Sequence, residues 1–309
     1  MKRIIFTLLC VAALAACTKE NGETTPETLP DSVPGRQISK IEGYSLSSEG
    51  QAELYCTSSF TYDENGRLVT IENVSVYSEG EKWVCPVEIT YADKAITYTY
   101  LDRIYGEGEV TADLDEQGRT HKFITRTAGP QPLALNIAQD TDNVKEYSMT
   151  YDENGYMTKF NNLTFNEVSS LEWKDGNLVK CTYVEELDTD ASNFTSIYTE
   201  YVPSDIVSDT SIDMFMLEEI FDDTSCAGEQ SVLGLIKACG KTSKNFPAII
   251  NEYNNYGMIQ LDRHTYEYEM TDGAITRINV KVEYIRGADM ERLKTESVDN
   301  SYFLITYNK

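Results

Sequence analysis

The sequence predicts a mainly β protein: a large curved antiparallel β-meander, open or barrel-like, with a short helical insertion at about residues 209–240. Three observations lead to this prediction. A strand–turn–strand unit recurs along the chain, apolar and polar side chains alternate between the turns, and the alternation stops at 209–240. Alternation with a period of two is typical of strands with one buried and one solvated face.

The recurring unit is an aromatic or Thr-rich strand, a polar turn that ends in glycine, and a second strand. In the copy at 60–71, Asp63 can cap the turn through its side chain, and Gly66 can adopt the left-handed conformation that closes a bulged hairpin. We expect Gly155 to do the same in the copy at 149–160. The turn glycines are therefore predicted to be structural. Further copies are found at 113–123, 171–183 and 268–278.

Four segments show the alternation most clearly, and in each one the apolar residues are predicted to share one face of the sheet. These residues are Trp83, Cys85, Val87, Ile89 and Tyr91; Tyr266, Tyr268 and Met270; Ile278, Val280, Val282 and Tyr284; and Phe303, Ile305 and Tyr307. A membrane-spanning barrel is disfavoured, because Arg277, Lys281 and Glu283 share the other face, where a lipid environment would make their charge costly.

Two cysteines test the register of the strands. Pairing across the turns at 63–66 and 78–81 places both Cys56 and Cys85 opposite residues 73 and 74, so they lie two strands apart, at about 9.6 Å. A disulfide tolerates at most about 7 Å between Cα atoms. We therefore expect no disulfide between these two cysteines.

Residues 209–240 carry the helical signal. The segment 209–211 can cap a helix that presents Met214, Leu217, Ile220 and Phe221 on one side. A second short helix at 231–236 is nearly all apolar and stops near Gly240. Because a helix of that composition must be covered, we expect it over the apolar face of the sheet or as a plug within its curl.

The N-terminus has the layout of a secretory signal peptide. Two basic residues precede an apolar run over 4–14, which is too short to span a bilayer because spanning takes about 20 residues. The segment Leu14-Ala15-Ala16-Cys17 resembles a lipobox, the site at which signal peptidase cleaves before an acylated cysteine. The resemblance implies a signal peptide at 1–16 and three acyl chains, palmitate among them, on Cys17. More than one chain makes membrane attachment stable.

The mature chain is expected to have two parts. Residues 17–36 are rich in Thr, Glu, Pro and Gly and are predicted to form a flexible lipidated tether. Residues 37–309 are expected to form a single β-rich domain. We expect an outer-membrane location; Lys19 and Glu20 match only the start of an acidic sorting signal, so the periplasmic face and the cell surface both remain open.

The charge balance restricts the possible partners. The chain has 26 basic and 51 acidic residues, a net charge of −25. Nucleic-acid binding depends on Lys and Arg contacts to phosphates, and no basic cluster follows residue 3, so nucleic acid is not an expected partner. We also predict no metal and no cofactor: His121 and His264 lie far from any cysteine in sequence, and the Asp-rich segments 140–143 and 188–190 lack the glycine and closing glutamate of a calcium loop.

No residue is predicted to be catalytic. Adjacent carboxylates such as Glu185 and Glu186 are unavoidable in so acidic a chain, whereas a glycosidase needs two carboxyls at a fixed separation. The first hypothesis is a non-catalytic binding or structural module for a glycan, a peptide or an envelope protein. The alternative is a hydrolase of envelope or dietary glycans whose site is assembled from distant carboxylates.

The tyrosines suggest where a ligand could bind. The chain contains 21 of them, and most are expected to pack within the sheet. If several shared an exposed concave face, they would form an aromatic platform able to stack on sugar rings. The candidates are Tyr98, Tyr100, Tyr198 and Tyr201.

Three features together resemble an uncharacterised lipoprotein family of gut Gram-negative bacteria, a domain of unknown function described as having a porin-like fold. They are the lipobox with its polar tether, the YDENG-type hairpins, and the helical insert followed by the segment 241–247, KTSKNFP. The resemblance spans nearly the whole mature chain. It implies a broad, strongly curved antiparallel sheet and no particular activity.

Overall fold

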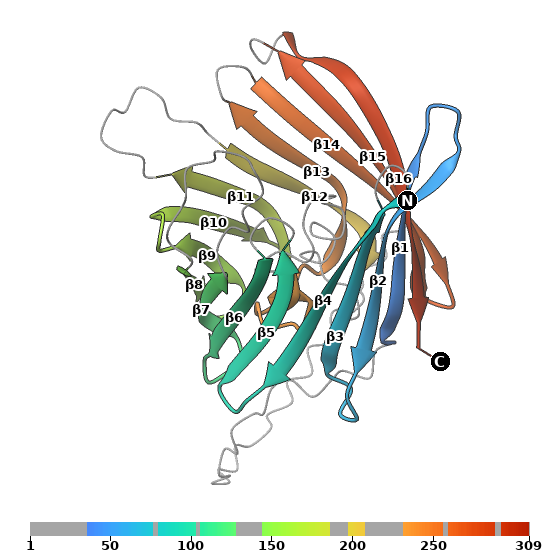
Figure 1. Ribbon diagram of the computed structural model, residues 1–309. Helices are drawn as coiled ribbons and strands as arrows, with labels where there is room; N and C mark the ends of the chain where they lie inside the picture. Colours follow the sequence, from blue (N-terminus) through green and yellow to red (C-terminus); the bar gives the residue numbers. More distant parts are fainter. Residues whose placement is uncertain are drawn as a thin grey trace, which may run out of the picture.

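The chain forms a closed antiparallel β-barrel (Figure 1). The computed structural model describes residues 36–76, 80–102, 106–127, 144–185, 197–207, 231–255, 259–287 and 292–308. Within these ranges sixteen strands follow one another around the barrel, and β1 closes it by pairing with β16. The predicted antiparallel meander is confirmed, and its barrel-like form is the one adopted. The strands are β1 Ile38–Leu46, β2 Ala52–Tyr62, β3 Leu68–Val76, β4 Lys82–Tyr91, β5 Ala95–Asp102, β6 Gly106–Leu114, β7 Thr120–Thr127, β8 Val144–Tyr151, β9 Met157–Asn162, β10 Glu167–Lys174, β11 Asn177–Glu185, β12 Ile197–Val207, β13 Asn245–Asn255, β14 Ile259–Thr271, β15 Ala274–Gly287 and β16 Lys294–Tyr307.

Because the strands run alternately up and down, the barrel has two distinct ends. The turn end holds the tight turns 63–67, 115–119, 152–156, 175–176 and 272–273. At the loop end lie the connections 47–51 and 163–166. Both ends of the described chain lie at the turn end, where the Asn308 amide donates to the Gln37 carbonyl.

The aspartate turns form as predicted. Asp63 Oδ1 accepts hydrogen bonds from the amides of Asn65 at 2.9 Å and Arg67 at 2.8 Å, and Gly66 has a φ of 76°. The turn at 152–156 repeats this arrangement, with a φ of 88° at Gly155. There, hydrogen bonds from the backbone of Tyr156 and then from Asn154 lower the pKa of the Asp152 carboxyl. A carboxylate that accepts several amides is stabilised in its charged form.

Apolar side chains point into the barrel, and polar ones point outward. In β4 the buried Cys85, Val87 and Ile89 alternate with exposed residues. Ile278, Val280, Phe303 and Ile305 are likewise buried, which confirms the apolar faces predicted for these strands.

Met270 is 49% exposed, although its face agrees with the prediction. It lies opposite Ile275, which is 1% exposed, and residues directly opposite each other across paired strands share a face. The register shift between Glu269 and Met270 adds a residue to β15 and not to β14, so Met270 keeps the face of Tyr268. Met270 is exposed because it lies close to the turn 272–273, at the turn end of the barrel.

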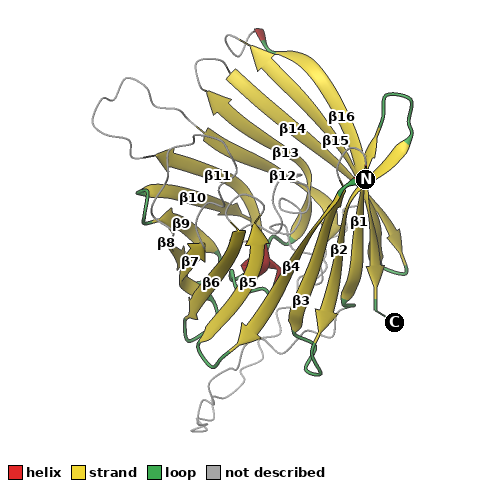
Figure 2. Ribbon diagram, viewed as in Figure 1, coloured by secondary structure: helices red, strands yellow, loops and turns green. Residues whose placement is uncertain are grey.

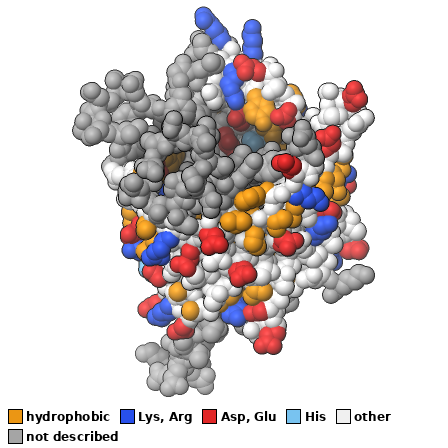
Figure 3. Space-filling view, viewed as in Figure 1, with side chains coloured by type: hydrophobic (Ala, Val, Ile, Leu, Met, Phe, Trp, Pro, Cys, Tyr) orange, Lys and Arg blue, Asp and Glu red, His pale blue; other side chains and the backbone are white. Residues whose placement is uncertain are grey.

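The outer surface of the barrel is charged. Its ion pairs include Lys122 with Glu146 at 2.6 Å and Lys281 with Glu283 at 3.0 Å. Acidic and basic side chains are scattered among apolar ones over the described surface in Figure 3. A basic residue facing lipid costs about 2–4 kcal/mol at the middle of a bilayer. The described outer surface therefore carries charges that would be costly in hydrocarbon, among exposed apolar side chains such as Val84 and Val202.

The short helix α2, Ser231–Leu235, lies within the ring of strands (Figure 2). Val232 and Leu233 are fully buried. The chain that follows bonds to the turn end: the Thr120 amide donates to the Ala238 carbonyl at 2.7 Å, and the amides of Lys241 and Lys244 donate to the carbonyls of Gly155 and Gly176 at 2.9 Å and 2.8 Å. We call residues 231–244 the plug.

The plug is the second of the two helical segments predicted from the sequence, and its place inside the curl of the sheet is confirmed. The first, with Met214, Leu217, Ile220 and Phe221, lies outside the described residues. In the described ranges, no helix is long and apolar enough to cross a membrane.

The predicted separation of the two cysteines by one strand is found, although the register differs from the prediction. Cys85 lies opposite Asn73 as expected, whereas Cys56 lies opposite Ser75 and not opposite residue 73 or 74; β3 separates the two. Adjacent strands are about 4.8 Å apart, and two such spacings exceed the reach of a disulfide. The register therefore keeps these two cysteines too far apart to bond to each other.

Candidate functional site

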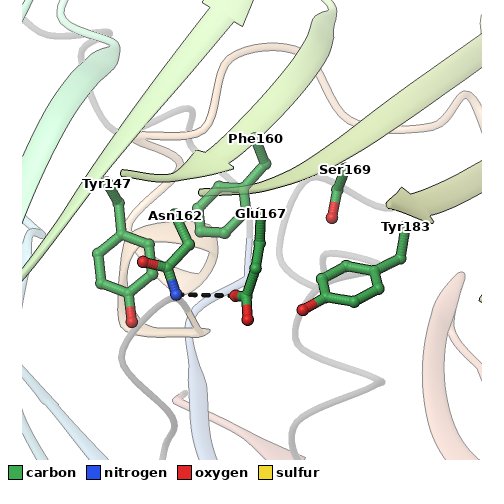
Figure 4. Close-up of a pocket in the computed structure, with 6 residues that line it drawn as sticks. All are labelled: Tyr147, Phe160, Asn162, Glu167, Ser169 and Tyr183. Carbon is green, nitrogen blue, oxygen red and sulfur yellow. Dashed lines mark hydrogen bonds between the residues drawn. The ribbon is translucent and has the colours of Figure 1, made fainter. Parts of the chain in front are cut away.

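A pocket of about 200 Å³ lies on the inner surface of the barrel, where strands β8 to β11 approach the loop end. Figure 4 shows that the side chains lining it extend to the same side of the strands. They do so because residues directly opposite each other across paired strands share a face. Tyr147 is opposite Asn162, Asn162 opposite Glu167, and Ser169 lies between Phe160 and Tyr183. We call this site the luminal pocket; its lining residues are Tyr147, Phe160, Asn162, Glu167, Ser169 and Tyr183.

One side of the luminal pocket is aromatic. The rings of Tyr147 and Phe160 stack with centroids 5.5 Å apart and an interplanar angle of 27°. Behind them Phe123, which is 0% exposed, stacks on Tyr147 at 4.5 Å. Packing on a buried ring restricts the motion of Tyr147 and Phe160, so this side of the pocket is a preformed apolar surface.

The other side of the luminal pocket is polar. Asn162 Nδ2 donates a hydrogen bond to Glu167 Oε2 at 2.9 Å (Figure 4). In the described part of the chain Glu167 forms no ion pair. Ser169, on the same strand as Glu167, and Tyr183, on the next strand, add hydroxyl groups. The pocket thus combines hydrogen-bond acceptors and donors with aromatic rings.

The turn 163–166 forms the loop-end edge of the luminal pocket, because it joins Asn162 to Glu167. Glu146 fixes its position: the Leu163 amide donates to the Glu146 carbonyl, and the Glu146 amide donates to Thr164 Oγ1, each at 2.8 Å. The turn exposes half of Leu163 and 44% of Phe165. Apolar side chains therefore border the entrance.

The four tyrosines proposed as an aromatic platform are not brought together. Tyr98, Tyr100 and Tyr201 are buried in the core. Tyr198 lies on the outer surface, where its ring stacks on Tyr253 at 4.4 Å. Tyr198 and Tyr201 are three residues apart on one strand, and an odd spacing directs side chains to opposite faces.

The luminal pocket was not predicted, because its residues lie beside a register shift. Met157 and Phe160 both face the interior although they are three residues apart. The shift between Thr150 and Tyr151 in the β8–β9 pairing accompanies this change of face. One signal was available in the sequence: Asn161, Asn162 and Glu167 interrupt the apolar alternation in this stretch.

The other candidate residues lie elsewhere. His264 is 3.7 Å from Glu252, and burial lowers its pKa, while the nearby Asp262 acts in the opposite direction. Among the described residues, no three His, Cys, Asp or Glu side chains come together as a metal-ligand set.

The fold and site together define a closed antiparallel β-barrel with a plugged turn end, a polar exterior and a small pocket near its loop end. Two solved structures share this fold. A porin-like protein from Bacteroides uniformis superposes with a TM-score of 0.60 at 15% identity, covering 92% of this chain and 100% of that one. A porin-like protein from Bacteroides vulgatus gives a TM-score of 0.52 at 14% identity, covering 88% and 99%. No protein-family model and no curated protein sequence matches the chain.

Proposed function

We propose that this chain is a lipid-anchored envelope protein that binds one sugar unit of a glycan in the luminal pocket, without catalysing a reaction. The observation that carries the proposal is the convergence of three aromatic and three polar side chains on one small cavity. Ligand sites are typically concave and mostly apolar, with a few polar groups that fix orientation. Aromatic rings can stack on the C–H face of a sugar, while Asn162, Glu167 and Ser169 can hydrogen-bond its hydroxyls.

The composition of the pocket supports binding over hydrolysis. A glycosidase uses two carboxyls, about 5–5.5 Å apart in retaining enzymes and about 6.5–9.5 Å apart in inverting ones. Glu167 is the one acid among the six lining residues. The pocket itself therefore supplies one half of such a pair.

Lipid attachment at Cys17 would hold a barrel with a polar exterior at the membrane. The outer surface carries ion pairs, so a separate anchor would hold the protein at the outer membrane. The lipobox-like segment and the tether 17–36 provide one, and the family resemblance and porin-like fold are consistent with it. β1 begins at the turn end, so the tether would join the barrel at the end away from the luminal pocket.

Lipid anchoring predicts that substitution of Cys17 changes both palmitate labelling and membrane fractionation. In a Gram-negative host, the wild-type chain is expected to incorporate labelled palmitate and to fractionate with the outer membrane. Cys17→Ser should abolish labelling and fractionation with the outer membrane, because the acylated side chain is lost. A Cys17→Ser protein that still incorporates palmitate, or still fractionates with the outer membrane, would contradict lipid anchoring at Cys17.

Sugar binding can be tested with the mature chain, residues 17–309, left unacylated by Cys17→Ser. We expect binding on a glycan array, and about fivefold weaker binding for Tyr183→Ala, because an aromatic contact contributes about 1 kcal/mol. Tyr198→Ala is the matched control: it removes a tyrosine from the outer surface and should bind normally. An array without any signal would contradict a sugar ligand.

A further inference from the structure

We infer that the ligand of the luminal pocket carries a protonated amine, so that an amino sugar or another ammonium compound binds in preference to a neutral sugar. The inference rests on the proposed function, because it concerns the same pocket. It adds the charge of the ligand, which the sugar hypothesis leaves open.

Glu167 is the first reason. Its carboxylate lines the pocket, accepts one hydrogen bond from Asn162, and has no basic partner in the described part of the chain. Removing a carboxylate from water is costly unless a counter-charge or enough hydrogen bonds replace the water. An ammonium group beside Glu167 would supply both a charge and N–H donors.

The aromatic rings are the second reason. A cation within about 6 Å of a ring centroid is attracted by the negative face of the ring. The luminal pocket places the rings of Tyr147, Phe160 and Tyr183 around the same space as the Glu167 carboxylate. The outer surface already uses this interaction: Arg277 lies 3.9 Å from the centroid of Tyr302, and Lys180 lies 4.5 Å from that of Tyr198.

The net charge of the whole chain also favours a cationic ligand. A net charge of −25 raises the local concentration of cations and disfavours anions. An opposing charge is Lys145, two residues before Tyr147 on β8 and therefore on the same face, with its ammonium 6.0 Å from the centroid of Phe165. Removing the Lys145 charge should therefore strengthen the binding of a cation.

The test compares four probes by calorimetric titration of the mature Cys17→Ser chain: D-glucosamine, N-acetyl-D-glucosamine, D-glucose and methylammonium chloride. It is run at about pH 6, where an amine of this kind is protonated. Glucosamine is expected to bind at least tenfold more tightly than glucose or the acetylated sugar. Glu167→Gln should remove this difference, because a glutamine amide carries no negative charge to pair with the ammonium group.

Two further variants separate charge recognition from a general loss of structure. Lys145→Gln is expected to bind glucosamine more tightly, an effect that misfolding would not produce. Glu172→Gln, on the outer surface of β10, should match the parent chain in every titration. Added salt should weaken glucosamine binding and leave glucose binding unchanged.

The outcomes distinguish the inference from the proposed function. If glucose and the acetylated sugar bind as tightly as glucosamine, the amine preference is overturned and sugar binding stands. If methylammonium binds and no sugar does, the amine preference stands and the sugar hypothesis falls. If none of the four probes binds, both are overturned.

Discussion

Gly240→Ala is expected to destabilise the barrel by about 3 kcal/mol, because Gly240 is a residue of the plug that packs directly against the turn 152–156. Gly240 has a φ of +80°, and a Cβ there would lie 2.6 Å from the Gly155 carbonyl oxygen and 2.7 Å from the Tyr151 ring. A left-handed backbone costs a non-glycine residue about 1–2 kcal/mol, and overpacking adds about 1–3 kcal/mol. At about 2–4 °C per kcal/mol, thermal unfolding followed by circular dichroism should show a fall in Tm of roughly 6–12 °C.

Gly273→Ala is the matched control for this substitution. Gly273 has nearly the same φ, +78°, but a Cβ at this position would meet no atom within 4 Å. The control therefore carries the backbone strain alone, and we expect a loss of about 1 kcal/mol. Equal losses for the two variants would show that contact between plug and turn does not stabilise the barrel.

The turns and faces of the fold could be predicted because they depend on residues close together in sequence. Asp63 and Gly66 act within one turn, and the alternation around Ile278 and Val280 needs only neighbours on its own strand. Closure of the barrel could not be predicted in this way. It pairs Ile41 with Ile305, residues at opposite ends of the domain, and depends on the twist accumulated over all the strands between them.

The luminal pocket was beyond sequence reasoning for a related reason. A register shift changes which residues face inward, and neither Met157 nor Phe160 shows where the shift lies. The tyrosine hypothesis failed for lack of the same information: Tyr198 and Tyr201 were grouped by residue type, whereas their spacing places them on opposite faces.

The reversed polarity of the barrel explains why a fold shared with porin-like proteins holds a small pocket. Sixteen-stranded porins leave an aqueous channel, and transmembrane barrels place their apolar band outside. Here Tyr98, Phe123, Phe246 and Phe303 fill the interior together with the plug. Space therefore remains where polar residues replace apolar ones, as Asn162, Glu167 and Ser169 do.

Phe123→Ala should have the largest effect of any substitution considered, because Phe123 supports both the core and the luminal pocket. Its ring is fully buried and stacks on Tyr147 at 4.5 Å. Truncating a buried phenylalanine to alanine costs about 3–5 kcal/mol, which chemical denaturation would measure. Any ligand of the pocket should also bind more weakly, since Tyr147 and Phe160 lose the ring that holds them in place.

Phe165→Ala separates these effects from the mere loss of an aromatic ring. Phe165 is 44% exposed at the edge of the same pocket, and a surface substitution usually changes stability by no more than about 0.5 kcal/mol. If Phe123→Ala were as stable as Phe165→Ala, the interior would have to contain water in place of packed side chains. The preformed aromatic surface on which ligand binding depends would then not exist.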